Sequence, residues 1–252
     1  MYNVYKTKQF RRYLKDDTID DGAQFTGMHF GRHAIVVGPT GSGKTSWLCN
    51  LIFQSDRGRR KQYEHIVIVT AAQEVLYTAL KDMLGERLTF VTNLADLELD
   101  EGDNVRVQRL VVFDDMITAD SRAMKRISDI FIRGRKMGAG ISAVFLAQSF
   151  FKIDKLIRAQ ASYLIFLKIA SVPNLKRIFQ EFDPGIEVSV FMRIFRNAVR
   201  EQFSVFKVDT RTNDLNRKFA RGWTEFYRVA DEGNEPLPLS QIRVFEHSAI
   251  LN

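Results

Sequence analysis

The sequence of 252 residues contains a single cysteine, Cys49, and this excludes an internal disulfide. A lone cysteine fits a reducing compartment better than an oxidising one. Because Cys49 stands in an apolar helical stretch, we expect it to be a small buried residue of a helix. Stability must therefore come from a packed core, and the chain is long enough to bury one.

Long hydrophobic runs are also missing. The longest apolar segments, ISAVFLA at 141–147 and YLIFL at 163–167, have the length of strands, far below the roughly 20 residues of a membrane-spanning helix. The first 17 residues, MYNVYKTKQFRRYLKDD, are polar and aromatic, unlike a secretory signal. We therefore expect no integral membrane segment and cytosol-like surroundings. The sequence also contains no internal repeat.

The charge balance is basic but not extreme. Lys and Arg number 37 against 30 Asp and Glu, a net charge of +7. Such a surplus weakly favours a polyanionic partner. An ordinary basic soluble protein explains the same number equally well, so charge alone does not decide.

Short apolar runs alternate with helical stretches, which indicates an α/β fold with a mainly parallel central sheet in three layers. Strands are expected at 33–37, 65–70, 88–91 (at an edge), 109–116, 141–148, 162–168 and 203–209. Helices are expected at 44–54, 73–84, 121–134, 174–181 and 187–200. We divide the chain into an N-terminal arm (1–30), one α/β domain (31–210) and a C-terminal tail (211–252).

The segment GPTGSGKT follows the first expected strand and opens a helix, as the P-loop pattern requires. Glycines let successive backbone N–H groups turn toward one anion, and the helix presents its positive end to the phosphates. Lys44 is expected to reach the β and γ phosphates of ATP, and the Thr45 hydroxyl to bind Mg²⁺. The expected nucleotide-binding residues are Gly38, Pro39, Thr40, Gly41, Ser42, Gly43, Lys44, Thr45 and Ser46.

Two carboxylates end the apolar run LVVFDD. In P-loop enzymes a strand-end aspartate holds Mg²⁺ through water, the role we assign to Asp114. A second acid can orient or deprotonate the attacking water, the role we assign to Asp115. The alternative is a pair that starts a turn and caps the next helix.

The spacing of the two motifs carries topological information. Asp114 lies 70 residues after Lys44 (114 − 44), so a whole strand–helix unit fits between them. Another strand can then be inserted in space between the loop strand and the acid strand. That layout is typical of motor-type P-loop ATPases that hydrolyse ATP, not of simple nucleoside kinases.

Gln148 ends the next apolar strand, at the edge where ligands of parallel sheets bind. Its amide is placed to touch both the γ-phosphate and the attacking water, and so to sense hydrolysis. A simple turn or cap is the alternative.

Arg133 and Arg135 lie between the acid strand's helix and the Gln148 strand. Ring ATPases take an arginine from a neighbouring subunit to stabilise charge on the γ-phosphate, and both residues are candidates. A solvated or DNA-contacting basic loop is the alternative. The run 57–61 is expected to be a solvated connection, with contact to a DNA backbone as the second interpretation.

Together GPTGSGKT, VVFDD, RGRK…GISAVFLAQSFFK and IRAQASYLIFLK resemble the poxvirus-type genome-packaging ATPases of large DNA viruses and virophages, within the FtsK–HerA superfamily. The resemblance covers about residues 30–210. It implies a RecA-like core, a homo-oligomeric ring (hexamer or pentamer), contact with capsid vertex proteins and pumping of double-stranded DNA into a capsid. It also implies a place in the virion or the infected-cell cytoplasm.

Two positions depart from the family pattern. Relatives carry the finger-type arginine closer to the Gly-Ile pair, where Met137 stands here, so Arg133 and Arg135 both remain candidates. Cellular relatives often carry Glu where Asp115 stands, which gives the carboxylate a longer reach.

The leading hypothesis is an ATP-hydrolysing motor that moves double-stranded DNA into a capsid. A motor that exports single-stranded DNA in phage assembly or conjugation is the second. A nucleotide-gated capsid-assembly subunit is the third. The Arg193, Arg196 and Arg200 face of one helix, or the 57–61 loop, is expected to contact DNA.

Overall fold

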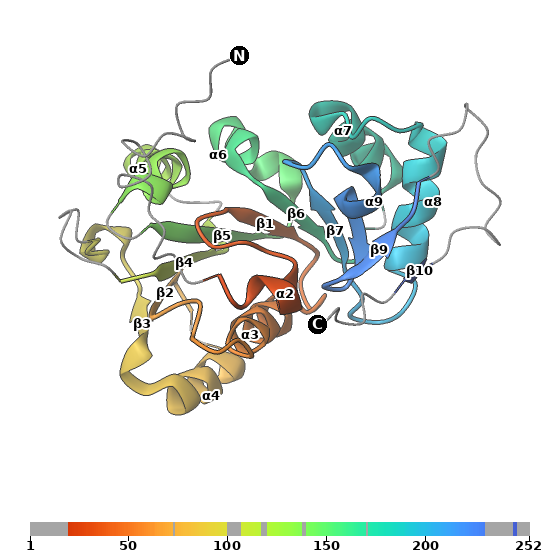
Figure 1. Ribbon diagram of the computed structural model, residues 1–252. Helices are drawn as coiled ribbons and strands as arrows, with labels where there is room; N and C mark the ends of the chain where they lie inside the picture. The colour runs from red at the N-terminus through yellow and green to blue at the C-terminus, as the bar shows by residue number, and fades with distance from the viewer. Residues whose placement is uncertain are drawn as a thin grey trace, which may run out of the picture.

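The computed structural model describes residues 20–72, 74–99, 107–116, 120–137, 140–169, 171–229 and 244–245 (Figure 1). Its strands are β1 (Ala34–Val37), β2 (His65–Thr70), β3 (Leu88–Val91), β4 (Arg109–Asp114), β5 (Ile141–Ala147), β6 (Tyr163–Phe166), β7 (Phe206–Asp209), β8 (Phe219–Arg221), β9 (Glu225–Tyr227) and β10 (Val244–Phe245). Its α-helices are α2 (Ala23–Thr26), α3 (Lys44–Ser55), α4 (Val75–Leu84), α5 (Ser121–Arg133), α6 (Lys155–Gln160), α7 (Val172–Phe182), α8 (Val188–Ala198) and α9 (Leu215–Lys218). Within these ranges, no helix is long and apolar enough to cross a membrane.

All ten strands form one sheet in the order β10-β9-β8-β7-β6-β1-β5-β4-β2-β3. The strands from β6 to β3 in this order are parallel, and β7 to β10 add an antiparallel extension. The mainly parallel sheet and the edge position of residues 88–91 are therefore confirmed. The inserted strand is confirmed as well, because β5 lies between β1 and β4.

Alternating residues of the strands belong to two hydrophobic cores, one on each face of the sheet. Even-numbered residues of β1 such as Val36 pack with Trp47, Leu48 and Leu51 of α3. Odd-numbered ones such as Val37 join a second core that includes residues of α5 to α8, among them Ile127, Ile157, Ile178 and Phe191. Figure 1 shows α3 and α4 on one side of the sheet and α5 and α6 on the other. The three-layer prediction is thus correct.

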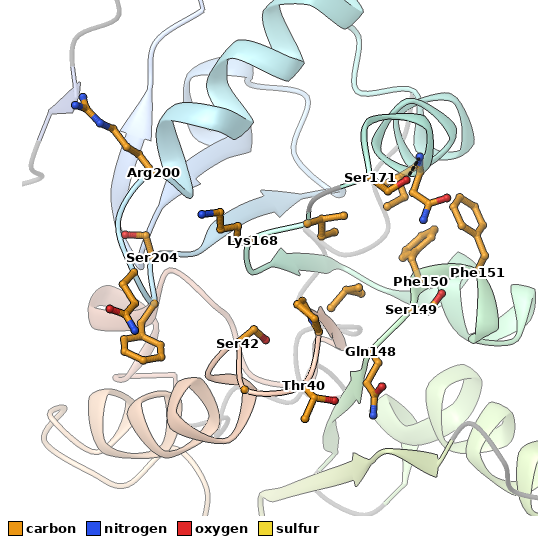
Figure 2. Close-up of a pocket in the computed structure, with 18 of the residues that line it drawn as sticks. Thr40, Ser42, Gln148, Ser149, Phe150, Phe151, Lys168, Ser171, Arg200 and Ser204 are labelled. Carbon is orange, nitrogen blue, oxygen red and sulfur yellow. Dashed lines mark hydrogen bonds between the residues drawn. The ribbon is translucent and has the colours of Figure 1, made fainter.

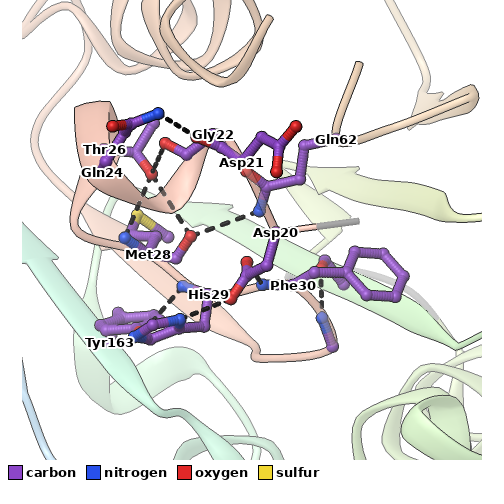
Figure 3. Close-up of polar contacts among 12 residues, drawn as sticks. Asp20, Asp21, Gly22, Gln24, Thr26, Met28, His29, Phe30, Gln62 and Tyr163 are labelled. Carbon is purple, nitrogen blue, oxygen red and sulfur yellow. Dashed lines mark hydrogen bonds and ion pairs between the residues drawn. The ribbon is translucent and has the colours of Figure 1, made fainter. Parts of the chain in front are cut away.

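The segment before β1 is tied down by polar contacts (Figure 3). Asp20 accepts hydrogen bonds from the Phe30 N–H (2.7 Å) and pairs with His29 Nδ1 (2.6 Å). The hydroxyl of Tyr163, on β6, accepts from the His29 N–H at 3.1 Å. Residues 20–32 therefore pack on the sheet. Most of the predicted arm, residues 1–19, lies outside the described residues.

Besides the pairing of β7 with β6, a buried cation and an aromatic pair fix the C-terminal strands to the rest of the molecule. Lys207 of β7 is fully buried and donates to the carbonyls of Thr26 (2.9 Å) and Trp223. Burial lowers the pKa of Lys207 to about 7. Trp223 also stacks on Trp47 of α3, with ring centroids 5.5 Å apart. Within residues 211–229, β8 and β9 continue the sheet, while the division of the chain at 30 and 210 stays a prediction.

Two local predictions need correction. The predicted helix 187–200 ends at Ala198, because Val199 (φ −102°, ψ 20°) leaves the helical backbone, so Arg200 lies in the following turn. Arg193, Arg196 and Arg200 therefore do not share one helix face. Cys49, expected to be buried, is half-buried on α3, and burial raises the pKa of its thiol.

Candidate active site at the carboxyl ends of the strands

The carboxyl ends of three neighbouring strands lie in register and gather the predicted site residues. Val37, the last residue of β1, pairs with Ala147 of β5, and Asp114 of β4 pairs with Leu146. The phosphate loop, Gln148 and the acid pair therefore leave the sheet side by side. Parallel strands with these connections expose their following loops at this edge, where ligands bind.

The phosphate loop contains backbone conformations that glycine adopts more easily than other residues. Gly41 (φ 73°) and Gly43 (φ 98°) lie in the left-handed region, and a Cβ on Gly38 would lie only 2.4 Å from Ser42 Oγ. The loop ends at Lys44, where α3 begins. The helix therefore points its unpaired N–H groups and positive end at the space inside the loop, as an anion site requires.

Lys44 folds back over this loop. Its Nζ donates to the carbonyls of Gly38 (2.9 Å) and Pro39 (3.2 Å). Partial burial lowers the pKa of Lys44, while the carboxylates of Asp114, Asp115 and Glu74 act to raise it. The ammonium thus lies among three acids at the mouth of the loop, where it can receive a phosphate.

Thr45 has a partner that the sequence patterns do not reveal. Its Oγ1 donates to a carboxylate oxygen of Glu74 at 2.9 Å. Glu74 precedes the first residue of α4, just beyond the end of β2. Because β2 pairs with β4, this acid lies beside Asp114. An isolated acid in a connection carries no local signal, so only the strand order reveals it.

Asp114 is held by Tyr77, a second residue that no motif predicts. The Tyr77 hydroxyl donates to Asp114 Oδ2 at 2.6 Å from the buried side of α4. Burial raises the pKa of Asp114, opposed by this hydrogen bond. Burial next to Asp114 also raises the pKa of Tyr77, so the phenol stays a donor.

Asp115 and Gln148 form a pair across β4 and β5. Gln148 Nε2 donates to Asp115 Oδ2 at 3.1 Å, and both side chains are exposed. Asp115 has φ 53°, and its N–H bonds to the Leu146 carbonyl at 3.2 Å. A non-glycine residue in this region is uncommon, and such conformations cluster at functional sites. The turn aims the second acid at Gln148 instead of capping the next helix, which Asp120 caps.

The donor set fits magnesium. Thr45 Oγ1 and the Asp114 carboxylate are hard oxygen donors beside the phosphate loop. Within the described part of the chain, no group of three or more His, Cys, Asp or Glu residues is arranged to hold a metal alone. Magnesium at phosphate sites commonly uses one or two protein oxygens, with substrate phosphates and water completing its shell.

A cavity of about 880 Å³ opens on the outer side of the phosphate loop (Figure 2). Thr40 and Ser42 lie on one side of it, Gln148 and Ser149 on another, and Lys168 and Arg200 contribute cations. The remaining wall includes Phe203 and Ser204 from the turn before β7. The cavity has the size of a small-molecule site.

Arg133 and Arg135 do not join this site. Both are exposed and precede β5, at the amino ends of the strands, and the same is true of the 57–61 loop before β2. β5 has seven residues, which places the two arginines roughly 20 Å from the acid pair. The sequence-predicted residues therefore divide into Lys44, Thr45, Asp114, Asp115 and Gln148 at one edge and the two arginines at the other.

The loop, the acid pair and the strand inserted between them have the arrangement of a P-loop nucleoside triphosphatase. A family model described as Poxvirus A32 protein matches residues 28–210, and the chain belongs to this family. The resemblance stated from the sequence is thereby confirmed. No curated protein sequence matches the chain.

Solved structures share the fold. The DNA-packaging ATPase B204 from Sulfolobus Turreted Icosahedral Virus is 13% identical, with TM-score 0.54 over 77% of this chain and 98% of that one. The genome packaging NTPase B204 from Sulfolobus turreted icosahedral virus 2, in complex with sulfate, is 13% identical, with TM-score 0.55 over 77% and 97%. The cytoplasmic domain of the Thermomonospora curvata type VII secretion ATPase EccC is 14% identical, with TM-score 0.50 over 80% and 26%. At these identities the likeness concerns the fold.

Proposed function

We propose that this protein is an ATP-hydrolysing motor that moves double-stranded DNA into a viral capsid. The observation that carries the proposal is the convergence of Lys44, the Asp114–Asp115 pair and Gln148 on adjacent strand ends, with β5 between β1 and β4. Membership of the Poxvirus A32 family and the fold shared with B204 support the packaging role.

In this proposal the chain's residues have separate tasks. Lys44 and the loop amides hold the phosphates, while Thr45 and Asp114 hold Mg²⁺. When bound, the metal neutralises charge on the phosphate oxygens. Asp115 orients the attacking water and takes its proton as the new bond to the γ phosphorus forms and the bond to the β-phosphate oxygen breaks. Gln148, which is hydrogen-bonded to Asp115, senses the hydrolysis of the γ-phosphate and transmits it to β5.

Arg133 or Arg135 serves a neighbouring subunit in a ring, hexameric or pentameric. Their position at the opposite edge of the sheet supports action in trans, because neither lies near the Asp114–Asp115 pair of its own subunit. Capsid vertex proteins and DNA are the further partners in this proposal, and the virion or the infected-cell cytoplasm is the place of action.

The test is ATP hydrolysis measured without DNA, with double-stranded DNA and with single-stranded DNA. We expect Mg²⁺-dependent hydrolysis that double-stranded DNA stimulates, and Lys44→Ala as the inactive control. Stronger stimulation by single strands would favour an export motor instead. Nucleotide binding without turnover would favour an assembly subunit, and mass measurement with and without ATP would then show whether nucleotide drives assembly.

A further inference from the structure

Phe203 combines two features that a purely structural residue seldom has together. Its side chain is 62% exposed, and its backbone has φ 63°, in the left-handed region. A bulky non-glycine residue there is a genuine outlier, and strain of this kind persists only where the surroundings impose it.

The turn around Phe203 is anchored on both sides. The Ser204 N–H bonds to the Glu201 carbonyl at 3.3 Å, and the Glu201 carboxylate pairs with Arg221 of β8 at 2.6 Å. The Gly222 N–H also bonds to the Val205 carbonyl at 3.0 Å. The antiparallel extension of the sheet therefore fixes the turn, and with it the direction of the Phe203 ring.

The ring lies against the start of the phosphate-loop helix. Its Cδ1 is 2.9 Å from the point where a Cβ on Gly43 would lie, so any side chain at position 43 would collide with it. Gly43 is itself in the left-handed region and directly precedes Lys44. Two residues with left-handed backbones, 160 positions apart in the chain (203 − 43), thus meet at the phosphate site.

The surroundings of the ring suit a flat polar ligand. Phe203 lines the cavity beside the phosphate loop, together with the polar side chains of Gln202 and Ser204. Figure 2 shows Ser42, Lys168 and Ser204 around the same opening. A triphosphate held by the loop extends its ribose and base out of the loop. The exposed ring of Phe203 lies next to Gly43, so a base that is one ribose away from the phosphates can contact it.

We propose that Phe203 is the platform on which the base of the bound nucleoside triphosphate stacks. The inference rests on the proposed nucleotide-binding function and adds the subsite for the base. Stacking recognises the flat face of any base. The platform therefore favours nucleotides over bare polyphosphate, and it does not by itself separate ATP from GTP.

The test compares two ligands that share their phosphates, a non-hydrolysable ATP analogue and inorganic tripolyphosphate, by calorimetry. Phe203→Asn removes the ring but suits the left-handed backbone, because Asn tolerates that region. We expect it to weaken binding of the analogue about tenfold and to leave tripolyphosphate binding unchanged. Phe53→Asn, at another partly exposed phenylalanine (37%) near the far end of α3, is the matched control and should change neither affinity.

A second variant guards against a folding defect. Phe203→Trp keeps an aromatic platform, so it should retain the affinity for the analogue, and its added fluorescence should change with the analogue but not with tripolyphosphate. Equal loss of both ligands in Phe203→Asn would show that the ring only shapes the loop and would overturn the inference. Unchanged analogue binding would overturn it as well. Failure of the wild type to bind either ligand would instead remove the proposed function.

Discussion

At the carboxyl ends of the strands, several polar side chains bond to one another; at the amino ends, several polar side chains bond to backbone N–H groups instead. The first edge carries the pairs Thr45–Glu74, Tyr77–Asp114 and Gln148–Asp115. At the second edge the N–H groups of Ala143, Gly31 and His29 donate to the side chains of His33, Ser142 and Tyr163.

This difference separates two kinds of constraint. A bond between two accessible side chains, such as that between Gln148 and Asp115, can be exchanged for a bond to a ligand without disturbing the chain path. A side chain that satisfies a buried backbone group cannot leave without exposing an unpaired donor. Substitutions at the carboxyl edge should therefore change chemistry, and buried ones at the amino edge should change stability.

At the amino edge, only substitutions of the exposed Arg133 and Arg135 are expected to change the rate of ATP hydrolysis. If one of them acts on a neighbouring subunit, Arg133→Ala or Arg135→Ala should lower hydrolysis by about a thousandfold or more, with the unfolding midpoint unchanged. Mixing that variant with Lys44→Ala should restore measurable activity, because some interfaces then join an intact loop to an intact arginine. Two inactive variants that stay inactive together would contradict action in trans.

Asp115→Asn should lower ATP hydrolysis by about a hundred- to ten-thousandfold while leaving nucleotide affinity intact. Asn tolerates the left-handed backbone at this position, so the fold should keep its free energy of unfolding. Binding, turnover and denaturant unfolding should be measured on the same preparation. Full activity would remove Asp115 from its proposed role and leave Glu74 as the carboxylate to test next.

His33 should make stability depend on pH. Burial lowers the pKa of His33 from 6.5 to about 4, with Arg135 and Arg211 contributing, and its Nδ1 accepts from the Ala143 N–H at 3.1 Å. Well above pH 6.5 the ring is neutral in both states; as pH falls through 6.5 toward 4, the unfolded chain takes up a proton that the folded one excludes. Stability should therefore fall by about 2 kcal/mol between pH 7 and 5 through this residue.

The measurement is urea unfolding of wild type and His33→Asn at both pH values. The variant is expected to be less stable at pH 7 and to lose less stability on acidification. Equal pH dependence in the two proteins would show that His33 does not exclude the proton in the folded state.

Glu74→Gln should have the smallest effect. It keeps an oxygen that can accept from Thr45 but removes one of three negative charges around Lys44. We expect a several-fold rise in the Mg²⁺ concentration that supports half-maximal hydrolysis, because less negative charge faces the metal. Glu86→Gln, an exposed acid after α4, is the control. An identical rise in the control would assign the effect to overall charge.

The sequence predicts those parts of the site that consist of contiguous residues. The loop at 38–45, the acid pair and Gln148 each follow an apolar run, and parallel strands bring such ends together. Glu74 and Tyr77 were not predicted, because their role depends on β2 pairing with β4. Phe203 was missed for a related reason, since its place is set by the antiparallel extension and by the early end of α8.

The stacked Trp47 and Trp223 have a practical consequence. They are the two tryptophans of the whole sequence, and they contact each other at the junction of the phosphate-loop helix and the C-terminal strands. The native ultraviolet emission of the unlabelled protein therefore comes mainly from a single point. Any event that separates α3 from that extension, whether ligand entry, assembly or unfolding, should change the wavelength and intensity of the tryptophan fluorescence. No dye or added probe is needed to detect it.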